Sequence, residues 1–257
     1  MTVIPSPRAG LWWGRPISEL RWQLEWAALL ADPVWRGVGV PRGDGSPVLL
    51  VPGFLSGDVS LRSLRTWLQR IGYRTYRADI RWNVDCAERA MVRLERRVTT
   101  VVQRTGQPVR VLGHSRGGLF ARALVHRCPE DLTEVITLGS PLANELDCSV
   151  STMAAVTGAR AVQRLLRPEA RRDGCFTRDC RCAYTSDIRA PLPATVPLTS
   201  IYTRDDGIVR PSACRPPDAE CIDVGGSHLG LGVNADVYRH LGRLLARRRP
   251  SAEQELS

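Results

Sequence analysis

The chain has 257 residues, of which 43% are hydrophobic and 24% are charged. This length and composition indicate a soluble globular domain with a sizeable core, and they exclude a mini-protein and a wholly disordered chain. The formal net charge is +10, but all 36 basic residues are Arg, a pattern typical of codon bias. Because no zinc-finger, RRM or KH pattern accompanies the charge, we expect no nucleic-acid partner, and only a weak attraction to anionic membrane or lipid surfaces stays open.

The sequence has neither a candidate membrane span nor a recognisable signal peptide. No apolar run approaches the roughly 18 residues that a spanning helix needs, and the run at 26–31 is flanked by Glu25 and Asp32. Charged residues also interrupt the first 25 positions, where a signal peptide would need about 7 to 15 uninterrupted apolar residues. We therefore expect a cytoplasmic protein, with export left open by the eight cysteines.

Residues 1–40 are predicted to form a Trp-rich helical segment, with a helix at about 17–32 that carries two apolar stripes. One stripe comprises Ile17, Leu20, Leu24, Ala28 and Ala31, and the other comprises Trp22, Trp26 and Leu29 or Leu30. Such a helix needs cover on two sides. We expect it to pack on or near the main domain, and the alternative is a flap or interfacial anchor beside an apolar substrate site.

Residues 41–257 show short apolar runs that alternate with helical patterns. Strands are predicted at 48–51, 73–80, 109–113, 135–139, 198–202 and 219–224, and helices at about 60–71, 86–104, 116–127 and 235–248. This alternation predicts an α/β domain with a mainly parallel sheet, whose functional loops follow the carboxyl ends of the strands. The interval at about 142–196 has no clear strand, a helical piece near 153–166 and several cysteines, and we interpret it as an inserted lid or cap.

Ser115 is the strongest candidate for a catalytic residue. It is the central residue of a G-x-S-x-G sequence, GHSRG at 113–117, between a predicted strand and a predicted helix. This is the context of a nucleophile elbow, a turn too sharp for side chains at Gly113 and Gly117. The elbow also places the serine at the positive end of the following helix.

Together with other segments, this motif resembles the α/β-hydrolase superfamily, in particular its lipase and esterase branch. The resemblance spans about 41–245 and rests on VLLVPGF at 48–54, GHSRGG at 113–118, LGSP at 138–141, YTRDDGIV at 202–209 and GSH at 226–228. It implies an α/β-hydrolase fold with helices flanking the sheet. Two departures are Pro52-Gly53, where many lipases carry His-Gly, and Arg116 after the nucleophile, where smaller or apolar side chains are more usual.

A serine nucleophile needs a histidine base oriented by a carboxylate. The resemblance assigns the base to His228, which lies in a Gly-Gly-Ser-His loop before the last helix, whereas His114 is expected to support the strand end or a loop. His126 and His240 lie within predicted helices. The resemblance assigns the acid to Asp206, which gives the order Ser115, Asp206, His228.

Alternatives for the acid are Asp205, its neighbour, and Glu145 or Asp147, which follow the preceding strand. The oxyanion hole needs two N–H donors. The backbone of Arg116 supplies one, and by resemblance the backbone of Phe54 supplies the second, with Leu55 as the alternative.

The eight cysteines predict no metal site, because their spacing lacks the paired C-x2-C knuckles of structural zinc. Disulfides between the lid and the Asp206 loop are the preferred interpretation, with buried free thiols as the alternative.

The resulting hypothesis is a serine esterase or lipase that needs no cofactor and acts on a lipid-like or medium-chain ester. Its alternatives are an acyltransferase or thioesterase with the same triad, and a non-catalytic binding module.

Overall fold

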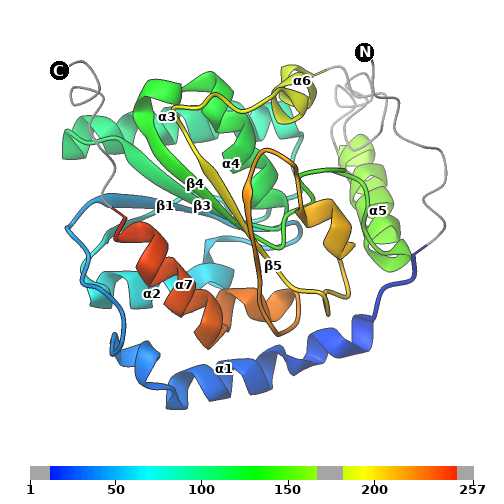
Figure 1. The fold of residues 1–257 in the computed structure, drawn as a ribbon. Coiled ribbons are helices and arrows are strands. Elements are labelled where there is room, and N and C mark those ends of the chain that lie inside the picture. The colour runs from blue at the N-terminus through cyan, green and yellow to red at the C-terminus, as the bar shows by residue number, and fades with distance from the viewer. Residues whose placement is uncertain (1–11, 167–181, 248–257) are drawn as a thin grey trace.

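The computed structural model describes residues 12–166 and 182–247 and is built around a central six-stranded sheet. All strand pairs are parallel, and the strand order is β2-β1-β3-β4-β5-β6 (Figure 1). The strands are β1 (Pro47–Val51), β2 (Arg74–Arg77), β3 (Val109–His114), β4 (Leu132–Leu138), β5 (Leu198–Tyr202) and β6 (Glu220–Asp223). The expectation of a mainly parallel sheet is therefore confirmed.

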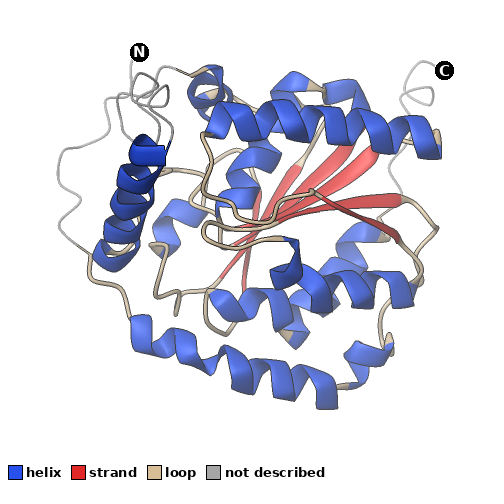
Figure 2. Ribbon diagram, turned by 180° about the vertical axis from the view of Figure 1, so that it is seen from behind, coloured by secondary structure: helices blue, strands red, loops and turns tan. Residues whose placement is uncertain are grey.

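Helices cover both faces of the sheet, as Figure 2 shows. They are α1 (Trp22–Ala31), α2 (Arg62–Ile71), α3 (Ala87–Thr105), α4 (Arg116–Arg127), α5 (Val150–Leu166), α6 (Ala183–Arg189) and α7 (Ala235–Leu245). Along β1, Leu49 and Val51 pack with α3 and α4, whereas Val48 and Leu50 pack with α2 and α7. This alternation explains the continuous apolar run, because a strand buried on both faces needs apolar residues at every position.

The two edge strands are shorter and more polar than the central ones. β2 ends at Arg77, three residues before the predicted end, and Asp79 has a left-handed backbone with φ of +58°. β6 is likewise limited to Glu220–Asp223. Polar, partly exposed residues suit a strand with one unpaired edge, and they carry a weaker sequence signal than the apolar central strands.

The N-terminal segment runs along the domain surface as a series of short helices. A 3-10 helix, η1 (Pro16–Arg21), leads into α1, and a second, η2 (Pro33–Arg36), follows it. Only Leu29 of α1 is buried, and the helix contacts η7 (Leu229–Val233) near the carboxyl edge of the sheet (Figure 1). None of the described helices combines the length and the apolar composition that a membrane span requires.

Residues 142–166 and 182–196 of the insertion contain α5 and α6 and no named strand. An isolated antiparallel bridge joins Cys148 to Val209, which ties the start of the insertion to the loop after β5. Much of the Cys-rich stretch, including Cys175 and Cys180, lies outside the described residues. Whether the insertion acts as a lid stays a prediction.

Candidate active site

Ser115 lies at the sharp turn between β3 and α4. Its backbone has φ of +53°, a conformation that non-glycine residues rarely adopt, and its N–H donates to the Leu138 carbonyl at 2.8 Å. A Cβ atom added at Gly113 would lie 2.5 Å from the Gly117 backbone, and one at Gly117 would lie 2.2 Å from the Val51 carbonyl oxygen. The glycines of the motif are therefore required by close backbone packing.

The loop after β1 packs directly against this turn. A Cβ atom at Gly53 would lie 3.1 Å from the Ser115 Cβ and 3.2 Å from His114 Nδ1. This close approach brings Phe54 to the same cavity walls as Ser115. Phe54 and Arg116, the preferred sequence candidates for the oxyanion hole, thus line the cavity beside the serine from separate segments.

Asp206 and His228 form a buried pair on the loops after β5 and β6. The Asp206 Oδ2 atom lies 2.6 Å from His228 Nδ1, and Oδ1 accepts hydrogen bonds from the backbone N–H groups of Ile208 at 2.9 Å and Val209 at 2.7 Å. Burial lowers the pKa of His228, but the charge and hydrogen bond of Asp206 outweigh it, so the pKa lies above its ordinary value. This carboxylate therefore fixes both the orientation and the tautomer of the ring.

The three alternative carboxylates that the sequence analysis named do not contact the His228 ring. Asp205 is exposed, Asp147 accepts from Arg210 Nε at 2.9 Å, and Glu145 pairs with Arg189. Of the four candidates, Asp206 is the one that meets the His228 ring.

Ser115 and His228 line the same cavity, but among the described residues no hydrogen bond joins the Ser115 hydroxyl to the His228 ring. In proteins without bound substrate, catalytic hydrogen bonds are often long and tighten only in the complex.

His114 supports the His228 loop. Its Nε2 atom lies 3.0 Å from the His228 carbonyl oxygen, and the two ring centroids are 5.0 Å apart. Burial and the neighbouring His228 charge lower the pKa of His114 to about 4. At neutral pH the ring is therefore uncharged and donates to this carbonyl. His126 and His240 lie within α4 and α7, in the helices where the sequence places them.

Two glutamates of the N-terminal segment contact the same loops, and sequence reasoning missed both. Glu19 is buried, and its carboxylate accepts from the backbone N–H groups of Gly207 at 2.8 Å, His228 at 3.2 Å and Leu229 at 2.8 Å. Glu25 accepts from the N–H and hydroxyl of Ser227 at 2.8 and 3.0 Å. Their local sequence gave no signal, because Ser18, Arg21 and Gln23 make the same segment polar and an exposed acid would fit it equally well.

The Arg116 side chain has a structural role beyond the backbone N–H considered from the sequence. Its guanidinium donates to the Asn83 side-chain and backbone oxygens at 2.9 and 3.1 Å and to the Asp85 carbonyl at 2.7 Å. The Asn83 amide donates in turn to the Pro52 carbonyl at 2.8 Å. This network fastens the loop that carries Phe54 to the first residue of α4.

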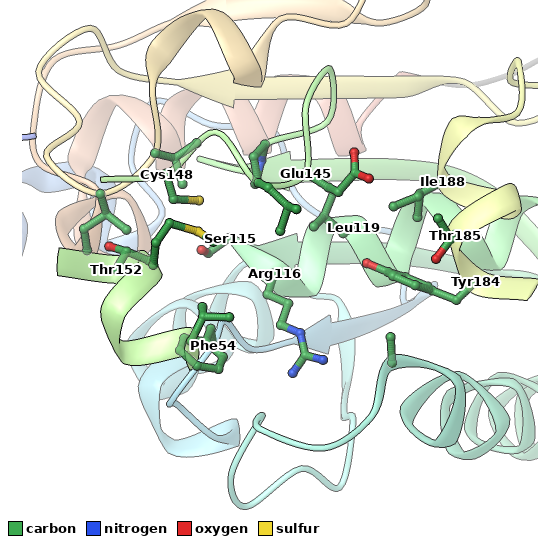
Figure 3. Close-up of a pocket in the computed structure, with 17 residues that line it drawn as sticks. Phe54, Ser115, Arg116, Leu119, Glu145, Cys148, Thr152, Tyr184, Thr185 and Ile188 are labelled. Carbon is green, nitrogen blue, oxygen red and sulfur yellow. The ribbon is translucent and has the colours of Figure 1, made fainter. Parts of the chain in front are cut away.

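Two cavities meet at Ser115, and Phe54, Thr152 and Ile208 line both. The narrow cavity has a volume of about 110 Å³, and Figure 3 shows several of its side chains. Its apolar walls include Leu119, Met153, Val156, Tyr184 and Ile188. The wide cavity has a volume of about 790 Å³, and its exposed apolar lining residues are Trp22, Trp26, Leu55, Val59 and Leu229.

The described cysteines are free thiols. They are Cys86, Cys128, Cys148, Cys182, Cys214 and Cys221. The expected disulfides between the insertion and the Asp206 loop are therefore not formed by these six, and Cys175 and Cys180 lie outside the described residues. Burial raises the pKa of Cys148 to about 12, which keeps it protonated. Within 12–166 and 182–247, no group of His, Cys, Asp or Glu side chains is arranged to hold a metal ion.

Comparisons with known proteins identify the type of fold and a family. The family model described as palmitoyl protein thioesterase matches residues 47–180. No curated protein matches the chain at a significant level.

Among solved structures, a monoacylglycerol lipase of Paleococcus ferrophilus matches with a TM-score of 0.52 and 15% identity, over 80% of this chain and 96% of that one. A soluble variant of the Saccharomyces cerevisiae monoglyceride lipase matches with a TM-score of 0.57 and 15% identity, over 84% and 90%. The mature lipase BlEst2 of Bacillus licheniformis matches with a TM-score of 0.54 and 15% identity, over 81% and 95%. At these identities the likeness is one of fold, and that fold is the α/β-hydrolase fold.

Proposed function

The chain belongs to the palmitoyl protein thioesterase family and has the α/β-hydrolase fold, and from this premise we propose that it is a serine hydrolase of carboxylic esters. Its substrates carry lipid-like or medium-chain acyl groups. The observation that carries the proposal is the buried pair in which Asp206 Oδ2 lies 2.6 Å from His228 Nδ1, because His228 lines the same cavity as Ser115. Three loops from distant parts of the chain meet there.

In the proposed mechanism, Ser115 Oγ attacks the acyl carbonyl carbon while His228 Nε2 takes the serine proton. Asp206 stabilises the imidazolium that forms. His228 then returns the proton to the leaving group, and an acyl-enzyme remains on Ser115. Water, deprotonated by His228, attacks this ester. The second tetrahedral intermediate collapses as His228 returns the proton to Ser115 Oγ, and the carboxylic acid leaves.

The oxyanion of each tetrahedral intermediate is proposed to accept from the backbone N–H groups of Phe54 and Arg116. The Gly53 approach to Ser115 and the position of Arg116 at the start of α4 support this assignment. One such donor is worth about 3 to 4 kcal/mol of transition-state stabilisation.

The two cavities suggest where the two parts of a substrate bind on either side of Ser115. The narrow apolar cavity suits the acyl chain, and the wide cavity suits the leaving group. Side chains of α5 and α6 line the narrow cavity, so the insertion is proposed to control the acyl chain length.

A thioesterase is the second candidate, because the matching family is described by that activity. The triad chemistry is the same for a thioester, with a thiol as the leaving group. Activity on matched pairs of oxygen esters and thioesters with one acyl group would separate the two, and added alcohol acceptors would reveal acyl transfer by a change in product partition.

The direct test compares the wild type with Ser115→Ala on nitrophenyl esters and acyl thioesters of increasing chain length. We expect turnover to fall by about 10⁴ to 10⁶-fold with the fold intact. Ser60→Ala removes a hydroxyl from the wall of the wide cavity and serves as the matched control, with activity within about twofold of wild type. A fluorophosphonate probe should label the wild type at Ser115, and equal hydrolysis by wild type and Ser115→Ala would refute the proposal.

A further inference from the structure

The N-terminal helical segment has its carboxylates turned towards the domain and its apolar side chains turned towards solvent. All three acidic residues of 12–36 make inward contacts: Glu19 and Glu25 with the loops already described, and Asp32 with Arg239 at 2.7 Å. A helix on the surface of a globular protein normally buries its apolar face. Here the arrangement is reversed.

Four exposed apolar side chains follow one another along the segment: Trp13 before η1, Ile17 and Leu20 on η1, and Leu24 on α1. Trp13, Ile17, Leu20 and Leu24 are 70%, 81%, 65% and 74% exposed. Ile17, Leu20 and Leu24 belong to the first of the two apolar stripes that the sequence analysis predicts to be covered. In the second stripe Leu29 is buried, and Trp22 and Trp26 line the wide cavity while staying partly exposed. Every residue of the first stripe is exposed.

The charge around the stripe has one sign. Arg15 and Arg21 lie within the sequence span of the stripe, and with Arg36 on η2 they are the exposed charged residues of the described N-terminal segment. Arg21 Nη2 also lies 3.6 Å from Glu25 Oε1. The whole chain carries a net charge of +10. An apolar stripe bordered by arginines is complementary to a lipid surface with anionic headgroups, because the apolar side chains can enter the acyl boundary while guanidinium groups meet phosphates.

The stripe also lies beside the entrance to the candidate site. Opposite the stripe, α1 lines the wide cavity with Trp22 and Trp26, and the exposed Leu55 and Leu229 line the same cavity. A protein held on a membrane through these side chains would have its wide cavity next to the lipid phase. A second copy of the chain suits the stripe less well, because stable protein interfaces typically use about 20 to 30 residues on each side.

We propose that the stripe formed by Trp13, Ile17, Leu20 and Leu24 binds the surface of membranes that contain anionic phospholipids. The segment from Trp13 through η1 and α1 lies flat on the membrane in this arrangement, with Glu19 and Glu25 still bound to the loops that carry Asp206 and His228. The binding is separate from catalysis, and it is therefore tested without any substrate.

The experiment measures co-sedimentation of the full chain with phosphatidylcholine vesicles that contain phosphatidylserine, and with vesicles of phosphatidylcholine alone. We expect tighter binding to the anionic vesicles and weaker binding in high salt, because salt screens the arginines. Ser115→Ala should bind like wild type, so a failure of the proposed hydrolase function would leave this result unchanged.

The variants Ile17→Ser and Leu24→Ser remove apolar side chains from the stripe without touching the cavities. Each should weaken vesicle binding by about tenfold, since burying one large aliphatic side chain corresponds to at least one decade in an equilibrium constant. Val92→Ser, at an exposed apolar position on α3, is the matched control and should bind like wild type. Hydrolysis of a water-soluble short-chain ester should be equal in all three variants.

Two results would overturn the proposal. One is vesicle binding that is absent or is weakened equally by Val92→Ser and Leu24→Ser. The other is a concentration-dependent dimer in sedimentation velocity that Leu24→Ser dissociates, which would assign the stripe to a second copy of the chain.

Discussion

Glu19 accepts a hydrogen bond from the backbone N–H of His228 at 3.2 Å, although 209 residues separate them in the chain. The same carboxylate oxygen accepts from Gly207, next to Asp206, at 2.8 Å. One side chain of the N-terminal segment therefore ties together the two loops that carry the buried pair. It also contributes to the raised pKa of His228, because its negative charge favours the protonated ring.

Replacing this carboxylate should change both rate and pH dependence. The Glu19 carboxylate now accepts from three backbone N–H groups. In Glu19→Gln the amide NH2 group would face at least one of these N–H groups, and two donors that face each other both lose their hydrogen bond. We expect kcat on a soluble ester to fall by about tenfold or more. The acid limb of kcat/KM should also move to lower pH, since loss of a negative charge lowers the His228 pKa.

Glu25→Gln is the matched control for this experiment. Its amide oxygen can still accept from the Ser227 N–H, and its NH2 group can donate to the Ser227 hydroxyl. We expect little change in kcat and no change in the pH profile. A purely structural role for Glu19 would instead leave the acid limb in place in both variants, which the pH profile would detect.

The pH profile of the wild type should be governed by His228. The ring must be neutral to accept the Ser115 proton, and its pKa is raised above the ordinary 6.5 by Asp206 and Glu19 against the effect of burial. Activity should therefore decline below a midpoint above pH 6.5. His114, with a pKa lowered to about 4, stays neutral through this range. Asp206→Asn should lower the midpoint and reduce kcat by about 10⁴-fold; an unchanged midpoint in that variant would contradict the assignment.

The Arg116 side chain should affect catalysis through the loop that carries Phe54. Arg116→Met keeps the backbone N–H but removes the contacts to Asn83 and Asp85. We expect kcat to fall by about 10 to 100-fold with a smaller change in KM, because a misplaced donor acts mainly on the transition state. Arg62→Met, at an exposed arginine of the wide cavity, is the control. A pure rise in KM would argue against a positioning role.

The narrow cavity should set the acyl chain length. Val156→Trp would fill part of the roughly 110 Å³ cavity, and we expect kcat/KM for long acyl chains to fall by more than tenfold while acetyl esters change by less than about twofold. Val59→Trp, on the wall of the wide cavity, is the control and should keep the wild-type chain-length preference. A series of nitrophenyl esters measures both, and equal losses at every length would contradict the assignment of this cavity to the acyl chain.

Local sequence determines much of this protein. The β3–α4 connection can be predicted from the sequence because an apolar strand, a Gly-flanked serine and a helical pattern follow one another within 20 residues. The structure has β3 at Val109–His114 and α4 at Arg116–Arg127. The central strands can also be predicted from the sequence, because burial on both faces demands a continuous apolar run. The choice between Asp205 and Asp206 needed the fold, because adjacent side chains point in different directions and only the packed loop decides which one meets His228.

The contribution of the N-terminal segment depended wholly on tertiary structure. Glu19 and Glu25 bind backbone groups about 200 residues away, and nothing in their local sequence distinguishes a buried acceptor from a solvent-exposed acid. The two apolar stripes were visible in the sequence, but their periodicity is the same whether a stripe is covered or exposed. Which stripe faces the cavity and which faces outward follows from how the whole chain packs, because burial is a property of the assembled fold and not of the residues in one helix.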